Sequence, residues 1–383
     1  MGETKQQSAG LQGDWSKIRR LIPYGFGAEA RKSLHRILQD FSVPFIVDQD
    51  TEKQGLLMEG VPILSPDELN HLEEGDKVVI TIAKRRYHEI GQVLERYGLK
   101  EGIDYCHLSH LITQWYPRYA HTYCLSSVHI ALTMACTLNC THCNMFVPYH
   151  KQPYMASAAD IERDLTLLFD RMDYVFSVDL IGGEALLNPN LPEILQMIQE
   201  RFAERIGQVN VTTNAVVLPK AETVEAMRKY GVFVAISDYT AAIGNRAQVD
   251  AMCKLLHDAQ VPVTVMRNRV WTDFGFPTNA WHLPKKKVRE HMMTCDPGWR
   301  GLNDGRLYFC HVAWSIERAG KYRLKQGDFL ELRDLPPHEE ATKNRILQYC
   351  QGDLGVPYMS FCRVCGGCGA DNANFVLAGE QME

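Results

Sequence analysis

Short apolar runs and amphipathic runs alternate along the first part of the chain. Apolar runs of about five residues bounded by polar or glycine residues predict strands, and longer runs with an apolar residue every three or four positions predict helices. The pattern predicts strands at Arg20–Tyr24, Pro44–Asp48 and Val78–Ala83 and a helix at His88–Tyr97. We therefore expect an α/β domain over residues 17–115, preceded by a flexible tail at residues 1–16.

The same alternation resumes on a longer period after residue 122. Strands are predicted at Val128–Met134, Tyr174–Ile181, Gln208–Thr213, Val232–Ile236 and Val261–Met266, with helices such as Ile161–Phe169 and Leu191–Phe202 between them. Repeated strand–helix units call for a parallel sheet. If that sheet curls into a barrel or part of one, the chemistry belongs at the carboxyl ends of its strands.

A glycine turn lies between the first predicted strand and its helix. Gly25, Gly27 and Ala30 fit the spacing of the dinucleotide fingerprint, in which two glycines allow a tight turn and a small third residue lets helix pack on strand. Asp48 stands where an acid that binds ribose is expected. We expect a Rossmann-like domain, and whether it binds a nucleotide or is only a scaffold stays open.

Charge and composition narrow the class of protein. The chain has 46 acidic and 41 basic residues and no long basic run, so nucleic acid is not the favoured partner. No apolar stretch approaches the roughly 20 residues of a membrane helix, and the first residues lack the apolar core of a signal peptide. We expect a cytoplasmic protein without a membrane partner. Its twelve cysteines then indicate metal binding or catalysis rather than disulfides.

Cys136, Cys140 and Cys143 lie within eight residues, directly after the predicted strand Val128–Met134. Three thiolates at this spacing suit one metal cluster. An iron–sulfur cubane normally takes four cysteine thiolates, so one iron would be left for a ligand from outside the protein. Zinc is the rival, although structural zinc sites usually present their ligands as two separated pairs.

With this triplet the chain resembles the radical S-adenosylmethionine (radical SAM) superfamily, whose Cys-x3-Cys-x2-Cys signature it matches residue for residue. The resemblance implies a partial (β/α)6 TIM-like barrel over residues 122–285. It also implies a [4Fe–4S] cluster on the three cysteines, with SAM bound at the open iron. The reduced cluster would cleave SAM to methionine and a 5′-deoxyadenosyl radical that abstracts hydrogen from substrate, with flavodoxin or ferredoxin as electron donor.

Polar or glycine residues end the next strands, and the resemblance gives them roles. Gly182-Gly183-Glu184 follows the second barrel strand and would contact the amino end of the SAM methionyl group. Asn214 and Ser237 resemble polar contacts to the SAM ribose or carboxylate, although each could equally cap a helix. The backbone of His142 would meet adenine.

A second group of cysteines fills the last third of the chain. Cys295 and Cys310 flank a predicted hairpin with Gly305 at its turn, and they resemble the start of the SPASM/twitch extension that holds auxiliary clusters. The full SPASM pattern has seven cysteines for two clusters, whereas only six remain here. We therefore expect a small cysteine-rich domain over residues 286–383 with one auxiliary [4Fe–4S] cluster.

The ligands expected for that cluster are Cys295, Cys310, Cys362 and Cys365, with Cys368 as the competitor for the last place and Cys350 as a further candidate. A zinc ribbon on the first four stays open. Tyr308 and His311 flank Cys310 and are candidates for tuning the cluster from behind its ligands.

Three functions follow. The first is a radical SAM oxidoreductase that oxidises or rearranges a small polar substrate, such as a sugar or nucleotide-sugar, with the auxiliary cluster accepting an electron. The stretch Gly55–Leu69 supports it, because it resembles nucleotide-binding-like domains beside enzymes of saccharide biosynthesis. The second is a peptide-modifying SPASM maturase, a class that commonly carries a winged-helix domain where this chain has an α/β domain. The third is a non-catalytic iron–sulfur protein, against which the intact Gly182-Gly183-Glu184 argues.

Overall fold

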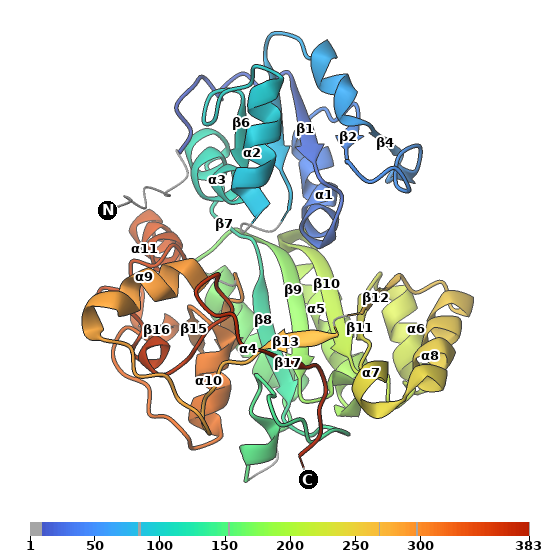
Figure 1. The fold of residues 1–383 in the computed structure, drawn as a ribbon, viewed down its shortest axis with the longest axis vertical. Coiled ribbons are helices and arrows are strands. Elements are labelled where there is room, and N and C mark those ends of the chain that lie inside the picture. Colours follow the sequence, from blue (N-terminus) through green and yellow to red (C-terminus); the bar gives the residue numbers. More distant parts are fainter. Residues whose placement is uncertain (1–9, 83–85, 152–153, 268, 296–297, 383) are drawn as a thin grey trace. The chain divides into compact units, whose positions relative to one another are not determined.

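The computed structural model describes residues 10–82, 86–151, 154–267, 269–295 and 298–382. The chain divides into two compact units, residues 1–126 and 127–383, which are described separately (Figure 1).

A parallel sheet is the centre of the first unit. Its strands are β1 (Arg20–Tyr24), β2 (Ile46–Val47), β3 (Leu57–Met58), β4 (Val61–Leu64), β5 (Asp76–Ile80) and β6 (Tyr105–His107). Their order is β3-β4-β2-β1-β5-β6, and all neighbours are parallel except β3 and β4. The unit also contains α1 (Ala28–Asp40), η1 (Pro66–His71), α2 (Tyr87–Arg96), α3 (Leu108–His110), η3 (Leu111–Ala120) and β7 (Cys124–Leu125). The predicted strands and helix are confirmed to within a few residues, while Ala83 lies outside the described residues.

Apolar side chains cover both faces of this sheet. Ile46 packs in one cluster with Leu34 of α1, whereas the adjacent Val47 packs in another with Leu94 of α2. Because successive side chains of a strand point to opposite faces, α1 and α2 lie on opposite faces of the sheet. This arrangement is the one that a Rossmann-like domain requires.

The glycine turn is present and Asp48 bonds to it, whereas binding of ribose by Asp48 stays a prediction. Gly25 has φ +93°, and a Cβ there would lie 2.2 Å from Cγ2 of Ile82, so only glycine fits. The buried Asp48 carboxylate accepts from the backbone N–H of Phe26 at 2.6 Å and from Lys53 at 3.2 Å. Since the carboxylate holds the turn itself, the structure favours the scaffold interpretation of this motif.

Residues 10–16 do not belong to the flexible tail that was predicted at residues 1–16. Trp15 is fully buried, and its indole N–H donates to the carbonyl of Gly102 at 2.7 Å. Gln12 also donates its backbone N–H to Gly102. Residues 10–16 are therefore part of the first unit, because a large aromatic side chain anchors them. Residues 1–9 lie outside the described residues.

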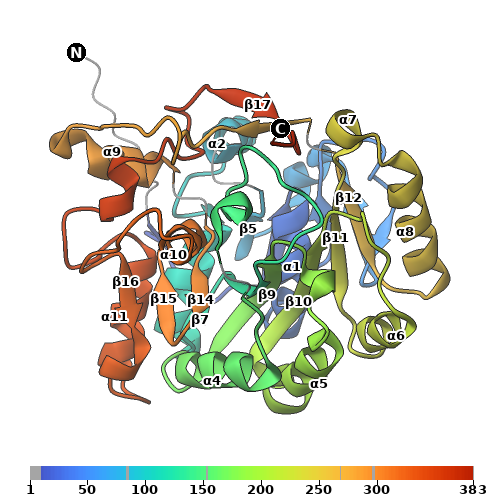
Figure 2. The same ribbon diagram turned by 90° about the horizontal axis from the view of Figure 1, so that it is seen from below.

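Five parallel strands form the core of the second unit. They are β8 (Val128–Thr133), β9 (Tyr174–Gly182), β10 (Ile206–Thr213), β11 (Phe233–Ser237) and β12 (Val263–Met266). The helices between them are α4 (Ala158–Phe169), α5 (Leu191–Phe202), α6 (Ala221–Lys229), α7 (Thr240–Ile243) and α8 (Arg246–Asp258), with short turns η4 (Val147–Tyr149), η5 (Ala185–Leu187) and η6 (Ala203–Arg205). Figure 2 shows α4, α5, α6 and α8 along the outer face of the strands.

The partial barrel is confirmed, and the predicted hairpin of the cysteine-rich segment joins its sheet. The sheet order is β12-β11-β10-β9-β8-β14-β15-β16, so it is open, with β12 and β16 as the outermost strands in that order. Its last three strands are β14 (Gly301–Asn303), β15 (Arg306–Tyr308) and β16 (Phe329–Glu331). β14 runs parallel to β8, and β15 and β16 are antiparallel. The strand–helix repeat thus supplies five parallel strands, and the sixth comes from the cysteine-rich segment. The division predicted at residue 286 stays a prediction.

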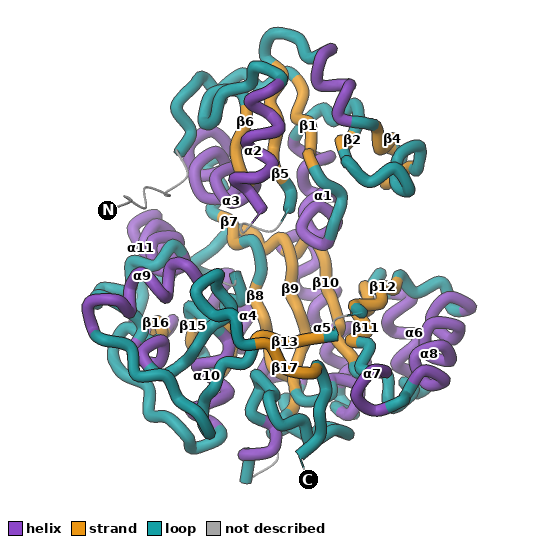
Figure 3. Tube along the Cα trace, viewed as in Figure 1, coloured by secondary structure: helices purple, strands orange, loops and turns teal. Residues whose placement is uncertain are grey.

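The remaining elements frame the cysteine-rich segment. They are β13 (Val270–Thr272), α9 (Lys285–Cys295), α10 (His311–Arg318), η7 (Leu332–Asp334), α11 (Glu340–Cys350), η8 (Ser360–Arg363) and β17 (Phe375–Leu377). β13 and β17 form a separate antiparallel pair. Much of this segment is loop between short elements (Figure 3). No helix among the described residues has the length and apolarity to cross a membrane.

Helix α4 shows how the sequence fixes one of these elements. The Ser157 side chain accepts from the backbone N–H of Asp160, whose carboxylate accepts from the backbone N–H of Ser157 in return. This capping box satisfies two backbone donors at the start of the helix. Asp164, one turn on, is buried and accepts from the backbone N–H of Gly305 at 2.9 Å. That contact ties α4 to the β14–β15 turn.

Asp164→Asn is expected to stabilise the protein at neutral pH. Burial raises the pKa of Asp164 to about 6, above the ordinary 3.8, so folding favours its protonated form and its contribution to stability falls as pH rises from about 4 to 6. Asparagine keeps a side-chain oxygen that accepts from the backbone N–H of Gly305, but it carries no negative charge. The free energy of unfolding of the variant should be higher than that of wild type by on the order of 1–3 kcal/mol at pH 7 and nearly equal to it at pH 4. Urea unfolding of both proteins at the two pH values measures this, and a difference that does not grow with pH would contradict it.

Candidate functional site

The loop after β8 carries the three clustered cysteines of the second unit. Cys140 is buried, and Cys136 and Cys143 are half-buried. Burial raises the pKa of Cys136 and of Cys143 to about 11 and also raises the pKa of Cys140. Such thiols keep their protons at neutral pH unless a metal replaces them, because a thiolate is the form that binds metal. The loop thus brings together three cysteine thiols. No described residue lowers their pKa enough to ionise them at neutral pH.

The glycine pair at the end of β9 lies directly against this loop. Gly183 and Glu184 donate their backbone N–H groups to the carbonyls of Thr133 and Ala135, both at 2.8 Å. A Cβ on Gly182 would lie 2.3 Å from the Thr133 oxygen, and one on Gly183 would lie 2.4 Å from the Ala135 oxygen. Both positions therefore need glycine so that two strand ends can approach each other. The predicted contact of these glycines with SAM stays a prediction.

Glu184 joins the ends of β9 and β10. Its carboxylate is almost fully buried and accepts from the backbone N–H groups of Leu186 at 3.0 Å and Asn214 at 2.8 Å. Burial raises the pKa of this carboxyl group. Its oxygens are engaged by the fold, which supports a positioning role; the predicted contact with SAM is untested.

Asn214 reaches from β10 to the cysteine loop. Its side-chain amide donates to Oγ1 of Thr137 at 3.1 Å and points at Sγ of Cys136 at 3.6 Å. The residue thereby orients the first cysteine. His142 lies on the other side of the loop, where its Nδ1 is 3.1 Å from Oδ1 of Asp273. Its imidazole is engaged with that carboxylate.

Ser237 ends β11, and its hydroxyl bonds the side chain of Tyr239. Tyr239 is a residue that the sequence did not single out. Burial raises its pKa, and the thiols of Cys140, Cys143 and Cys136 raise it further. An aromatic residue two positions after a strand end is a signal that could have been noticed. The structure thus gathers all the predicted strand-end residues around one loop.

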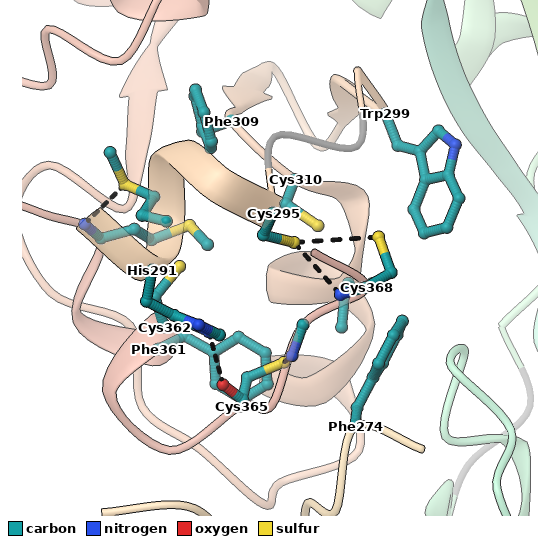
Figure 4. A pocket seen from close by; sticks show the side chains of 14 residues that line it. Phe274, His291, Cys295, Trp299, Phe309, Cys310, Phe361, Cys362, Cys365 and Cys368 are labelled. Atoms are coloured by element: carbon teal, nitrogen blue, oxygen red, sulfur yellow. Dashed lines mark hydrogen bonds between the residues drawn. The ribbon is translucent and has the colours of Figure 1, made fainter. Parts of the chain in front are cut away.

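The later cysteines line a cavity, which we call the second cavity because the loop after β8 is the first candidate site. Cys295, Cys310, Cys362, Cys365 and Cys368 all line it, together with aromatic side chains that include Phe274, Trp299 and Phe361 (Figure 4). Cys295 ends α9, Cys310 precedes α10, and Cys362 lies in η8. The four predicted ligands are thus brought together, although they come from three distant parts of the sequence. Cys350 does not line this cavity.

Cys368 also lines the cavity and lies beside Cys295. Its Sγ is 3.8 Å from Sγ of Cys295, to which its backbone N–H also donates at 3.4 Å. Cys365 accepts from the backbone N–H of Gly367 at 3.4 Å. Both remain candidates for the fourth place. Burial raises the pKa of Cys362 and of Cys365, so these thiols also need a metal to ionise them.

The second cavity fits a cluster, because cysteines from several elements line it. A cubane distributes its thiolates over four separate iron atoms. It therefore asks for ligands that surround a cavity, as these cysteines do.

The residues predicted to tune the second site lie outside its lining. Tyr308 packs against Phe329, and His311 stacks on His129 at 5.1 Å, so neither lines the cavity. His291 of α9 does line it, with Nδ1 2.6 Å from Asp371 and Nε2 2.9 Å from the carbonyl of Cys365. Tuning of the cluster by Tyr308 or His311 from behind its ligands stays a prediction.

Polar side chains also form a row across the middle of the parallel sheet. Strand register sets His129 beside Asp179 and Asp179 beside Asn210. The amide of Asn210 donates to Asp179 at 3.0 Å and to Ser177 at 2.9 Å, and Nε2 of His129 is 3.8 Å from Asp179. Because His129 stacks on His311, the row lies on the face that α10 covers. The alternation of Ser177 and Asp179 within an apolar run was its only signal in the sequence.

Comparison with known proteins agrees with this division of the chain. Residues 130–267 match the family model "Radical SAM superfamily", and residues 17–102 match the model "C2185-like, N-terminal".

Two curated proteins are similar over part of the chain. The antilisterial bacteriocin subtilosin biosynthesis protein AlbA of Bacillus subtilis is 28% identical over 176 residues, which are 42% of this chain and 36% of AlbA. A "Probable GTP 3′,8-cyclase" of Methanococcus maripaludis is 28% identical over 97 residues, which are 25% of this chain and 30% of that protein. The chain therefore matches about a third of the length of each relative.

Among solved structures, BtrN in complex with AdoMet and 2-DOIA aligns with 64% of this chain and 94% of its own, at 14% identity and a TM-score of 0.41. Overlap of this degree assigns no residue and no substrate.

Proposed function

Residues 130–267 of this chain are a radical SAM domain, and from this premise we propose an oxidoreductase that cleaves SAM reductively and abstracts hydrogen from a small polar substrate. Cys136, Cys140 and Cys143 would hold the [4Fe–4S] cluster at which SAM binds. When bound, the cluster and SAM supply a 5′-deoxyadenosyl radical. The observation that carries the proposal is the meeting of three cysteine thiols, one buried and two half-buried, with the Gly182-Gly183-Glu184 turn at the carboxyl ends of parallel strands.

The residues around the loop have separate tasks in this proposal. Glu184 holds the ends of β9 and β10 together, which fixes Asn214 beside Cys136. Asp273 holds the imidazole of His142 and so orients the backbone before Cys143. The close approach of β9 to the loop, which only glycine allows, keeps water from the back of the site.

The second cavity would hold an auxiliary [4Fe–4S] cluster on Cys295, Cys310, Cys362 and one of Cys365 and Cys368. The apolar and aromatic lining of the cavity supports the assignment. Low solvent exposure and hydrogen bonds to the sulfurs set the reduction potential of an iron–sulfur cluster. A cluster at this place would accept the electron that a substrate radical loses, which makes the overall reaction a two-electron oxidation.

The polar row on the sheet supports a small polar substrate. Parallel strands are normally apolar on both faces, so His129, Asp179 and Asn210 in one row call for an explanation. A carboxylate, an amide and an imidazole together can bind hydroxyl or amino groups, as a sugar presents.

The Rossmann-like first unit would help to recruit such a substrate, and its binding of a nucleotide remains a prediction. Flavodoxin or ferredoxin would deliver the electron, and the cytoplasm would be the compartment.

Modification of a peptide is the second candidate. The similarity to AlbA, a protein of bacteriocin biosynthesis, favours it. The matched part is about a third of that protein, so its substrate does not transfer directly.

Stimulated SAM cleavage distinguishes the two candidates. Reconstituted protein is incubated with SAM and dithionite, together with amino sugars and nucleotide-sugars in one set and peptides in another. We expect the first set to contain compounds that raise release of 5′-deoxyadenosine by about tenfold, because substrate binding completes the site. Asp179→Asn should lose the stimulation and keep the basal release. Stimulation by peptides alone would decide for the second candidate, and no release at all would refute both.

A further inference from the structure

Residues 379–382 cross the cysteine loop as a short strap. Cys140 and Gln381 form an antiparallel bridge. On either side of it, the backbone N–H of Thr141 donates to the carbonyl of Glu380, and the backbone N–H of Met382 donates to the carbonyl of Asn139, both at 2.8 Å. The strap therefore pairs with the loop through its backbone at the position of the middle cysteine.

The side chain of Gln381 is held in one orientation. Its Oε1 accepts from the backbone N–H of Asn139 at 2.7 Å, and its Nε2 donates to the carbonyl of Gly379 at 2.5 Å. A reversed amide would place oxygen against the Gly379 carbonyl and nitrogen against the Asn139 N–H, losing both bonds. The orientation that satisfies them leaves the second amide hydrogen for Cys140, whose Sγ lies 3.3 Å from Nε2.

The strap is fixed at its other end. β17 pairs with β13, which Figure 1 shows crossing in front of the parallel strands, and Ala378 is buried and donates to the carbonyl of Arg269 at 3.1 Å. Gly379 has φ +82°, and a Cβ there would lie 2.8 Å from the Tyr239 side chain. The strap thus passes close to Tyr239, which lies two positions after the end of β11. It is a built part of the site.

We infer that the Gln381 amide is a positioning residue that donates a hydrogen bond to the Cys140 sulfur and raises the reduction potential of the cluster held there. The inference rests on the proposed function, because it needs a cluster on Cys136, Cys140 and Cys143. A hydrogen bond to a ligand sulfur stabilises the more negative, reduced state of a cluster. The amide therefore makes the cluster easier to reduce by a physiological donor.

Three variants test this role. Gln381→Met removes the amide without adding charge. Gln381→Glu keeps an acceptor for Asn139 but cannot donate to sulfur when ionised, and it adds a negative charge. Met382→Ala is the matched control, because its exposed side chain belongs to the same strap and its backbone bonds remain. Iron content is measured first, and the potential is then measured by redox titration of the EPR signal that SAM perturbs.

We expect full iron content in all three variants and a lower potential in the two Gln381 variants. At a fixed solution potential, the ratio of reduced to oxidised cluster should fall by up to about tenfold in Gln381→Met. For a one-electron couple this corresponds to a shift of the reduction potential by about 59 mV. It should fall further in Gln381→Glu, and Met382→Ala should match wild type. An unchanged potential in Gln381→Met would overturn the inference. Loss of iron in that variant would overturn it too, since Gln381 would then support the loop rather than tune the cluster. Wild type without iron on the triplet would refute the proposed function instead.

Discussion

Cys140→Ala is expected to abolish release of 5′-deoxyadenosine from SAM. The middle cysteine of the loop is the most buried of the three and lies under the strap. Changing groups that merely support metal ligands typically lowers metal affinity or activity about 10–100-fold. Loss of a ligand itself should therefore lower the release by more than about 100-fold. Iron should fall from about eight to about four atoms per chain, because the auxiliary cluster stays. Incubation with SAM and dithionite, followed by chromatography of the products, measures the release.

The matched control for this experiment is Cys253→Ala. Cys253 lies on α8, is also a free cysteine and belongs to neither group of ligands. It should keep both iron and release at wild-type level. If Cys140→Ala releases as much 5′-deoxyadenosine as wild type, the proposed role of the triplet is wrong.

Cys362→Ala is expected to separate SAM cleavage from substrate oxidation. Cys362 is the informative choice because it lines the cavity and is expected to be a ligand whichever of Cys365 and Cys368 takes the last place. Iron should again fall by about four atoms per chain. Basal release of 5′-deoxyadenosine should persist, because the triplet is intact, while formation of oxidised product should be lost.

Mössbauer spectra of the iron that remains identify which cluster was removed. The single variants Cys365→Ala and Cys368→Ala then assign the fourth ligand, since only the true ligand should be needed. Wild-type iron of about four atoms per chain, unchanged in Cys362→Ala, would remove the auxiliary cluster from the proposal. Zinc bound in its place would favour the zinc ribbon.

Much of the fold follows from local pattern. The strand at residues 20–24 and the helix at residues 191–202 were predicted with the bounds that the structure gives. Local periodicity suffices for such elements, because a strand or helix is set by residues within a few positions of one another. The hairpin predicted between Cys295 and Cys310 is also present, as β14 and β15, but no local pattern predicted that β14 would pair with β8.

The sequence by itself determined which residues are candidates for the chemistry, because these candidates lie at short spacings. Three cysteines in one loop, glycines at a strand end and a second group of cysteines need no tertiary information to be read. Tertiary structure decided what each polar group contacts. It placed Asp48 in a backbone turn and Cys368 beside Cys295 in the second cavity, which Tyr308 and His311 do not line. It also brought Gln381 to Cys140 across 241 positions. Hydrogen bonds and burial depend on distance in space, and no local pattern records which distant segments will meet.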